Sequence, residues 1–314
     1  MLKELCEKKE SRKVIIFFLS AYVMPWILFP WIKSEEVSGV WAQWVMTLPA
    51  AGIIWGKWYV EGTRKDFFQK VFIVGSLCYA VYAVFCVAGV VPRQYIETGA
   101  DIVIIPFSVL LFFYCILFSN EKLYPFKNRK KMIIIVLSAM GYSILMGVIG
   151  DSAFHIGKQL LFEMGSVFNV LVLSGLCFMG EEYAWRGHLQ KKLQGYLGKR
   201  KGVILLGILW EIWHIPLWFG YFHFEQMSGG LVVVIILRFV NVIGLAIFLG
   251  WVYMKTENVW LCALLHGMNN QNNMLGTTVE ILPGIPIGAI IQPIILWTFL
   301  FSKVYKKEIS AKEE

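Results

Sequence analysis

The chain alternates long apolar stretches with short polar segments. An apolar stretch of about 20 residues is long enough to cross a bilayer as a helix. Ten stretches approach this length: 13–32, 39–58, 71–91, 102–119, 132–150, 163–186, 202–220, 230–253, 257–274 and 282–302. The ninth is the weakest, because the amide side chains of residues 269–273 crowd its end. The pattern predicts an all-α, polytopic membrane bundle of about ten transmembrane helices, within a range of eight to ten.

Composition supports a membrane protein. Hydrophobic residues make up 58% of the 314 positions, charged residues only 16%, and the mean hydropathy is +0.63. A soluble domain carries roughly 25% charged residues. A water-soluble globule has no room to bury so much apolar surface, so composition excludes the soluble classes of protein.

Basic residues are concentrated in every second connecting segment. These segments are 1–13, 59–70, 120–131, 187–201 and the tail after residue 302, whereas the other loops hold only Lys33, Arg93 and Lys158. By the positive-inside rule, we expect an integral protein of the cell membrane with both termini in the cytoplasm. The net charge of +8 follows from this distribution and gives no indication of nucleic-acid binding.

Two further features of the sequence favour retained helices that pack together. The first apolar stretch follows a basic segment, but it has no small-residue cleavage site, so we interpret it as a retained helix rather than a signal peptide. Five of the six cysteines lie inside predicted spans without metal-type spacing, which indicates packing residues.

The chain changes character after about residue 163. Spans six to nine carry a set of polar and ionisable residues: Glu181, Glu182, Arg186, Glu211, His214, Arg238, His266 and Asn270. An ionisable group at a helix centre costs about 2.5–3.5 kcal/mol on insertion scales. We therefore divide the chain into accessory N-terminal helices (1–160), a helical core that carries these residues and is the candidate catalytic part (161–275), and a final transmembrane helix with a cytoplasmic tail (276–314).

The segment FMGEEYAWRGHLQ, residues 178–190, offers two carboxylates with different surroundings. Glu182 and Arg186 are four residues apart, so they share a helical face and can pair. Glu181 is rotated by about 100° and need not share that partner. A buried carboxylate without a partner is suited to act as a general base. The alternative is a set of charges at the cytoplasmic end of a helix.

Two later segments repeat the four-residue spacing. Trp210 and His214 share one face in the seventh span, and Pro216 is expected to bend the helix beside His214. His266 and Asn270 share a face in the ninth span and could both donate hydrogen bonds to an oxyanion. The alternative for these residues is hydrogen bonding between helices. Given the predicted topology, all three motifs lie at a similar depth in the cytoplasmic half of the membrane.

Other polar residues favour structural interpretations. Arg238 could pair with Glu211 in a salt bridge, with binding of a substrate carboxylate as the alternative. His155, His188 and His223 fall in loops or at span ends and are interpreted as solvated.

Together, EEYAWRG, WEIWH and HGMNN resemble the motifs of the CAAX protease and bacteriocin-processing family of intramembrane proteases, also known from abortive-infection annotations. The family pattern is Glu-Glu-x-x-x-Arg, then Phe-x-x-x-His, then His-x-x-x-Asn on successive helices. The chain departs from it in having Trp210 where Phe is usual. The resemblance covers roughly residues 163–274, and the first five spans carry no matching signature.

The resemblance implies hydrolysis of a peptide bond in a hydrophobic peptide or lipidated protein within the membrane. At the matching motif positions, the resemblance implies that Glu181 and His214 activate a water. It also implies that Glu182 and Arg186 orient the site, and that His266 and Asn270 hold the oxyanion. We expect membrane lipids as partners and no nucleic acid.

We expect a glutamate mechanism without a cofactor. The family's older label is metalloprotease, and zinc, if it is bound, would take Glu181, His214 and His266 as ligands. Two other classes of function remain open: a membrane transporter, and a non-catalytic immunity protein that binds a peptide. A transporter is expected to carry paired broken helices in two halves, whereas the polar groups here fall almost entirely in spans six to nine.

Overall fold

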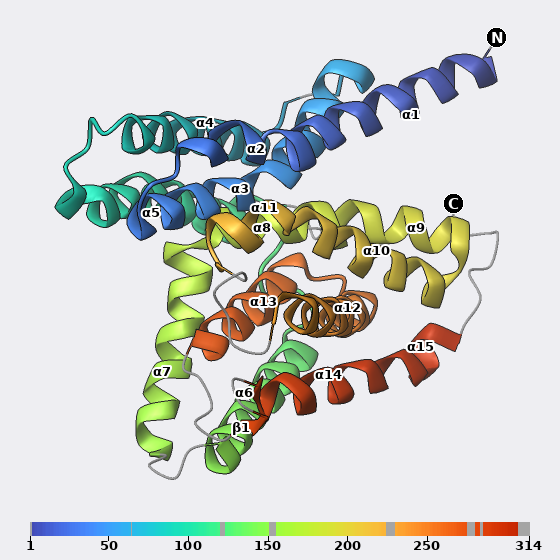
Figure 1. Ribbon diagram of the computed structural model, residues 1–314. Helices are drawn as coiled ribbons and strands as arrows, with labels where there is room; N and C mark the ends of the chain where they lie inside the picture. Colours follow the sequence, from blue (N-terminus) through green and yellow to red (C-terminus); the bar gives the residue numbers. More distant parts are fainter. Residues whose placement is uncertain are drawn as a thin grey trace.

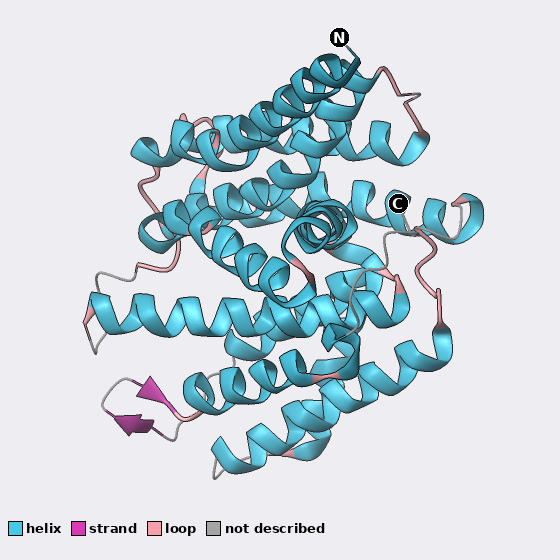
Figure 2. Cartoon of the chain, turned by 90° about the vertical axis from the view of Figure 1, so that its right-hand side faces the viewer, coloured by secondary structure: helices cyan, strands magenta, loops and turns pink. Residues whose placement is uncertain are grey.

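The structure is a computed structural model that describes residues 2–63, 65–119, 123–150, 155–223, 230–274, 280–282 and 285–306. The described chain is almost entirely helical (Figures 1 and 2). The α-helices are α1 Leu2–Phe18, α2 Pro25–Leu28, α3 Glu35–Gly56, α4 Phe67–Val87, α5 Ile96–Phe118, α6 Arg129–Gly150, α7 Ile156–Phe168, α8 Gly175–Ala184, α9 Gln190–Leu197, α10 Lys199–Trp213, α11 Ile215–Gly220, α12 Leu231–Thr256, α13 Val259–Met274, α14 Gly288–Thr298 and α15 Lys303–Lys306.

Short π-helical and 3-10 segments extend several of these helices. The π-helical segments are Leu19–Val23, Lys57–Glu61, Asn169–Leu173 and Trp185–Leu189, and the 3-10 segments are Phe29–Trp31, Arg93–Tyr95 and Phe299–Phe301. The strands β1 Glu280–Leu282 and β2 Ile285–Pro286 form a small antiparallel pair at the edge of the molecule (Figure 2).

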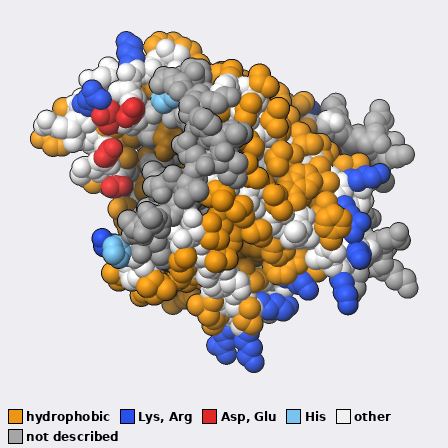
Figure 3. Space-filling model, turned by 60° about the horizontal axis from the view of Figure 1, so that its bottom comes forward, with side chains coloured by type: hydrophobic (Ala, Val, Ile, Leu, Met, Phe, Trp, Pro, Cys, Tyr) orange, Lys and Arg blue, Asp and Glu red, His pale blue; other side chains and the backbone are white. Residues whose placement is uncertain are grey.

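Seven helical segments among the described residues are long and apolar enough to cross a membrane. They are Lys9–Trp31, Glu35–Glu61, Phe67–Val87, Arg93–Phe118, Arg129–Ile149, Ile156–Leu173 and Leu231–Thr256, and Gly288–Phe301 is a shorter apolar helix. Figure 3 shows a broad band of hydrophobic side chains on one face, with basic side chains along one edge and acidic ones at the opposite side. The all-α membrane fold is confirmed, and the chain is an integral membrane protein. The count of ten spans is not confirmed.

Two of the predicted spans that carry the motifs are not continuous helices, and the tenth, 282–302, becomes helical only at Gly288. The stretch 163–186 is interrupted at Ser174, whose φ of −113° and ψ of 13° leave the helical region, so the Glu-Glu motif lies on a separate helix, α8. The signal for this break is the Ser174-Gly175 pair, a combination that is typical of turns. The stretch 202–220 is interrupted at His214, where α10 ends and α11 begins. This second break is the bend that Pro216 predicts.

Helix α8 occupies the centre of the bundle. The N-terminal helices α1–α5 form one side of the molecule, α12 and α13 lie on the other side of α8, and α14 and α15 lie beyond them (Figure 1). Helix α8 packs against both α3 and α13. The residues of α8 are therefore all buried, and its polar side chains face other parts of the protein.

Candidate active site

Glycine 180 sets the position of the two acidic residues that follow it. A Cβ atom at Gly180 would lie 2.3 Å from the carbonyl oxygen of Met46, so only glycine lets α8 and α3 approach this closely. The next two side chains, Glu181 and Glu182, are buried at 2% and 0% exposure. Burying a carboxylate without a partner is costly. The contacts of each oxygen therefore decide what the two residues can do.

Glu182 belongs to a buried cluster with two basic side chains. Nε of Arg186 lies 3.3 Å from its Oε2, and Nδ1 of His266 lies 3.1 Å from its Oε1. Neither contact is aligned as a hydrogen bond, and free enzymes often hold catalytic hydrogen bonds in such loose geometry. The guanidinium of Arg186 also lies over the ring of Trp210, 4.4 Å from its centroid. Arg186 thus compensates the charge of Glu182 at one oxygen, while a ring nitrogen of His266 faces the other.

Glu181 is held by a neutral donor instead. The indole Nε1 of Trp210 donates a hydrogen bond to Oε2 of Glu181 at 2.8 Å. Among the residues that the structure describes, Glu181 forms no ion pair, and its Oε1 accepts no hydrogen bond. One oxygen is therefore fixed, while the other remains available to take a proton. This difference between the two carboxylates agrees with the prediction from their spacing.

His214 lies at the interruption between α10 and α11. Its Nδ1 is 2.9 Å from the carbonyl oxygen of Trp210, and its ring packs edge-on against Trp213 with centroids 4.6 Å apart. A carbonyl only accepts hydrogen bonds, so Nδ1 carries the ring proton and Nε2 has a free lone pair. Trp210 therefore contacts both predicted water-activating residues, Glu181 through its indole and His214 through its backbone.

The third motif reaches the same place from α13. The ring of His266 packs edge-on against Trp210, with centroids 5.1 Å apart, and the Nδ2 of Asn270 lies 3.3 Å from its Nε2. His266 is buried, whereas Asn270 is exposed. Gly267 permits this placement, because a Cβ atom there would lie 2.3 Å from Cγ2 of Val170.

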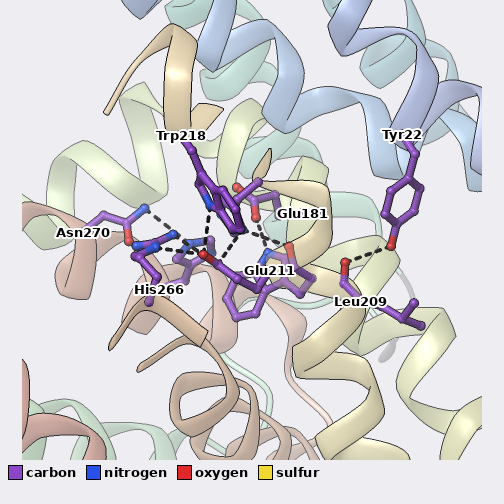
Figure 4. A network of polar contacts seen from close by, with 10 residues as sticks. Tyr22, Glu181, Leu209, Glu211, Trp218, His266 and Asn270 are labelled. Atoms are coloured by element: carbon purple, nitrogen blue, oxygen red, sulfur yellow. Dashed lines mark hydrogen bonds and ion pairs between the residues drawn. The ribbon is translucent and has the colours of Figure 1, made fainter. Parts of the chain in front are cut away.

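A third carboxylate, Glu211 of α10, extends the network. Glu211 is fully buried and contacts Arg238 of α12, Trp218 of α11 and His214. Figure 4 shows Glu181, Glu211, Trp218, His266 and Asn270 gathered in one region. The predicted Arg238–Glu211 salt bridge is confirmed, with Nε of Arg238 3.1 Å from Oε1.

Comparison with known proteins identifies the part of the chain that carries this network. Residues 163–271 match the model of a family described as type II CAAX prenyl endopeptidase Rce1-like. This segment, about a third of the chain, is similar to the Rce1-like family. A curated relative from Methanococcus maripaludis, named CAAX prenyl protease 2, is 27% identical over 165 residues. The alignment covers 50% of this chain and 59% of the relative, and no solved structure matches the chain.

The Rce1-like segment contains every predicted site residue. The structure brings Glu181, Glu182 and Arg186 of α8 and its continuation together with His214 and His266, and Asn270 contacts His266 from the next turn of α13. The roles assigned to these six residues stay predictions. Sequence reasoning treated Trp210 as an aromatic ring only and missed its hydrogen bond to Glu181. The departure from Phe to Trp was the available signal.

The donor set of the Rce1-like segment does not fit a metal ion. Within the described ranges, no group of three or more His, Cys, Asp or Glu side chains has the arrangement that a metal site requires. Both ring nitrogens of His266 face other groups, Nδ1 the carboxylate of Glu182 and Nε2 the amide of Asn270, so His266 has no nitrogen directed toward Glu181 and His214. Among the described residues, Glu181, His214 and His266 therefore do not form a zinc-binding set.

One histidine near the Rce1-like motif corrects the sequence interpretation. His188 was expected to be solvated, but its Nε2 contacts Nζ of Lys57 and its Nδ1 contacts the carbonyl oxygen of Tyr183 at 2.7 Å. Burial and the positive charge of Lys57 lower the pKa of His188 to about 3. The ring is therefore a neutral link between the end of α3 and the segment that follows Arg186.

Proposed function

We propose that this chain is an intramembrane endopeptidase that hydrolyses a peptide bond with a water activated by Glu181 and His214. The observation that carries the proposal is the unequal environment of two adjacent buried carboxylates. Glu182 pairs with Arg186 and faces His266, whereas one oxygen of Glu181 has no hydrogen-bond or ion-pair partner among the described residues. Such a pair separates a structural acid from a general base.

The proposed reaction begins when Glu181 takes a proton from a water that attacks the peptide carbonyl. The free Nε2 of His214 orients this water by accepting a hydrogen bond from it. Attack converts the carbonyl into a tetrahedral intermediate with an oxyanion. Collapse of the intermediate breaks the C–N bond, and the proton held by Glu181 passes to the departing amine. Proton and charge then balance without any other reactant.

Asn270 is the proposed donor to the oxyanion. Its Nδ2 lies next to Nε2 of His266, so that nitrogen accepts and the ring proton resides on Nδ1, which faces Glu182. The second N–H of the Asn270 amide is then free for the oxyanion. In this arrangement, His266 and Glu182 hold Asn270 in position, and Arg186 holds Glu182.

The substrate we propose is a hydrophobic or lipid-modified peptide. The curated relative is named for a CAAX prenyl protease, and a CAAX sequence carries its prenyl group on the cysteine. A prenyl chain adds about 0.8 kcal/mol per buried CH₂ and so favours entry from the lipid. The cytoplasmic location of both termini and residence in the cell membrane belong to the same proposal, because the basic loops alternate along the chain.

The experiment is cleavage of a quenched fluorescent peptide with a farnesylated cysteine followed by three residues. Purified protein in lipid nanodiscs is compared with Glu181→Gln, which keeps the size of the side chain but removes its basicity. We expect the variant to lose at least 1,000-fold in kcat while it keeps the melting temperature. A peptide-binding protein without activity would bind the peptide equally in both forms and cleave it in neither, and this outcome would overturn the proposal.

A further inference from the structure

Glu211 occupies a position that the Phe-x-x-x-His pattern leaves unspecified, yet it contacts a residue of the site. It follows Trp210 in the sequence and precedes His214 by three positions. Its carboxylate is fully buried at 0% exposure. An ionised carboxylate at such a site needs partners that compensate its charge. The identity of those partners shows what the residue does.

Arg238 supplies the compensating charge from α12. Its Nε donates to Oε1 of Glu211 at 3.1 Å and its Nη2 donates to Oε2 at 3.4 Å. This fork geometry fixes the plane of the carboxylate as well as its charge. The indole Nε1 of Trp218 donates to Oε1 at 3.0 Å. Two helices therefore determine the direction in which Glu211 points.

The fixed carboxylate points at His214. Oε2 of Glu211 lies 3.3 Å from Nδ1 of His214, the same nitrogen that donates to the carbonyl oxygen of Trp210. Both neighbours of Nδ1 are acceptors, so both favour the tautomer with the proton on Nδ1. A negative charge beside the ring also favours any positive charge that develops on it during the reaction.

His214 lies at a break in the helix, where the backbone alone gives its side chain little support. The helix is interrupted at His214, and Pro216 has no backbone N–H to support the first turn of α11. The Glu211 side chain bridges this interruption, since it belongs to α10 and binds Trp218 of α11. The backbone carbonyl oxygen of Glu211 also accepts a hydrogen bond from the backbone N–H of His214 at 3.0 Å.

We propose that Glu211, held by Arg238 and Trp218, is a positioning residue that fixes the orientation and tautomer of His214. This proposal rests on the proposed peptidase function. It assigns the Glu211–Arg238 pair a task beyond the structural salt bridge that the sequence suggests. Glu211 acts through His214 and touches no reacting atom.

The test distinguishes a role of Glu211 in positioning His214 from a role in stability alone. It does so with a double variant in which both charges of the Glu211–Arg238 pair are removed. Glu211→Gln alone leaves Arg238 without its partner and is expected to lower both the melting temperature and kcat. The double variant Glu211→Gln, Arg238→Gln removes both charges, so the melting temperature returns close to that of the wild type. We expect kcat on the farnesylated peptide to stay at least tenfold below the wild type, with KM within twofold.

A matched control removes a different hydrogen bond to the same helix. The hydroxyl of Tyr22 donates to the carbonyl oxygen of Leu209 at 2.9 Å (Figure 4), and Tyr22→Phe is expected to keep kcat. Glu211→Asp keeps the charge but withdraws the carboxylate from His214, so it provides a second test with less risk to folding. Its kcat is also expected to fall about tenfold.

Two outcomes distinguish this proposal from the peptidase function itself. If Glu181→Gln abolishes cleavage but the double variant and Glu211→Asp both cleave with wild-type kcat, positioning by Glu211 is wrong and the peptidase assignment stands. If Glu181→Gln cleaves as fast as the wild type, the assignment on which the proposal rests is wrong. Reduced kcat in the double variant with an unchanged melting temperature supports positioning.

Discussion

The buried cluster of Glu182, Arg186 and His266 makes a quantitative prediction about stability. The side chains of Glu182 and Arg186 are both 0% exposed and lie 3.3 Å apart. Removing one partner of a buried ion pair leaves an uncompensated charge and costs about 3–5 kcal/mol. We therefore consider the two single variants Glu182→Gln and Arg186→Gln, and the double variant that combines them.

Each single variant leaves one buried charge, which then has only its weaker remaining contact. In Arg186→Gln, Glu182 keeps only the contact to His266 at 3.1 Å. In Glu182→Gln, Arg186 keeps its position over the ring of Trp210 at 4.4 Å, and a desolvated contact of this type contributes about 2 kcal/mol. Both singles are expected to lose about 3 kcal/mol or more, with the smaller loss in Glu182→Gln.

The double variant removes both charges and is expected to lose no more than the worse single variant. Independent effects would instead add to about 6–10 kcal/mol. The assay is equilibrium unfolding in mixed SDS micelles followed by far-ultraviolet circular dichroism. Breaking the exposed Arg93–Glu36 pair serves as the control and is expected to have little effect. Additive losses, or single losses below about 1 kcal/mol, would refute the buried cluster.

Three further predictions concern packing, pH and metal. Gly180→Ala places a Cβ 2.3 Å from a backbone oxygen and should cost about 1–3 kcal/mol in the same unfolding assay, whereas Gly195→Ala, with nothing within 4 Å, should be neutral or stabilising. The folded-state pKa of His188 is lowered to about 3 from an ordinary 6.5. The contribution of the neutral ring to stability is therefore complete above about pH 6.5 and is lost as the pH falls toward 3. His188→Gln should flatten the dependence of the melting temperature on pH in that window, and an unchanged dependence would contradict the lowered pKa. Dialysis against a chelator should leave the cleavage rate unchanged, because no described donor set fits an ion; loss of cleavage with recovery on adding zinc would contradict this.

The fold class and some contacts of the candidate site could be predicted because they depend on local signals. Long apolar stretches can be recognised in the sequence without knowledge of tertiary contacts. Residues four apart share a helical face wherever the helix lies. The pairing of Glu182 with Arg186 and the interruption at His214 therefore follow from spacing and from a single proline.

The parts that could not be predicted depend on contacts between distant segments. The hydrogen bond from Trp210 to Glu181 joins α10 to α8, and nothing in the spacing of either motif specifies it. The partly buried ring of His188 contacts Lys57, which lies 131 residues away in the chain. The break at Ser174 is a local feature with a local signal, the Ser174-Gly175 pair, and it was missed because hydropathy alone does not register a change in backbone angles.

The most direct test of the central claim is whether Glu181 and His214 act on one water as a unit. The measurement is kcat on the farnesylated peptide for Glu181→Gln, His214→Ala and the double variant, each confirmed to be folded by its melting temperature. Residues that work as a unit show strongly non-additive losses. We predict that the double variant is no slower than the slower single variant. If the two fold-losses instead multiply in the double variant, the residues act independently and the account is contradicted.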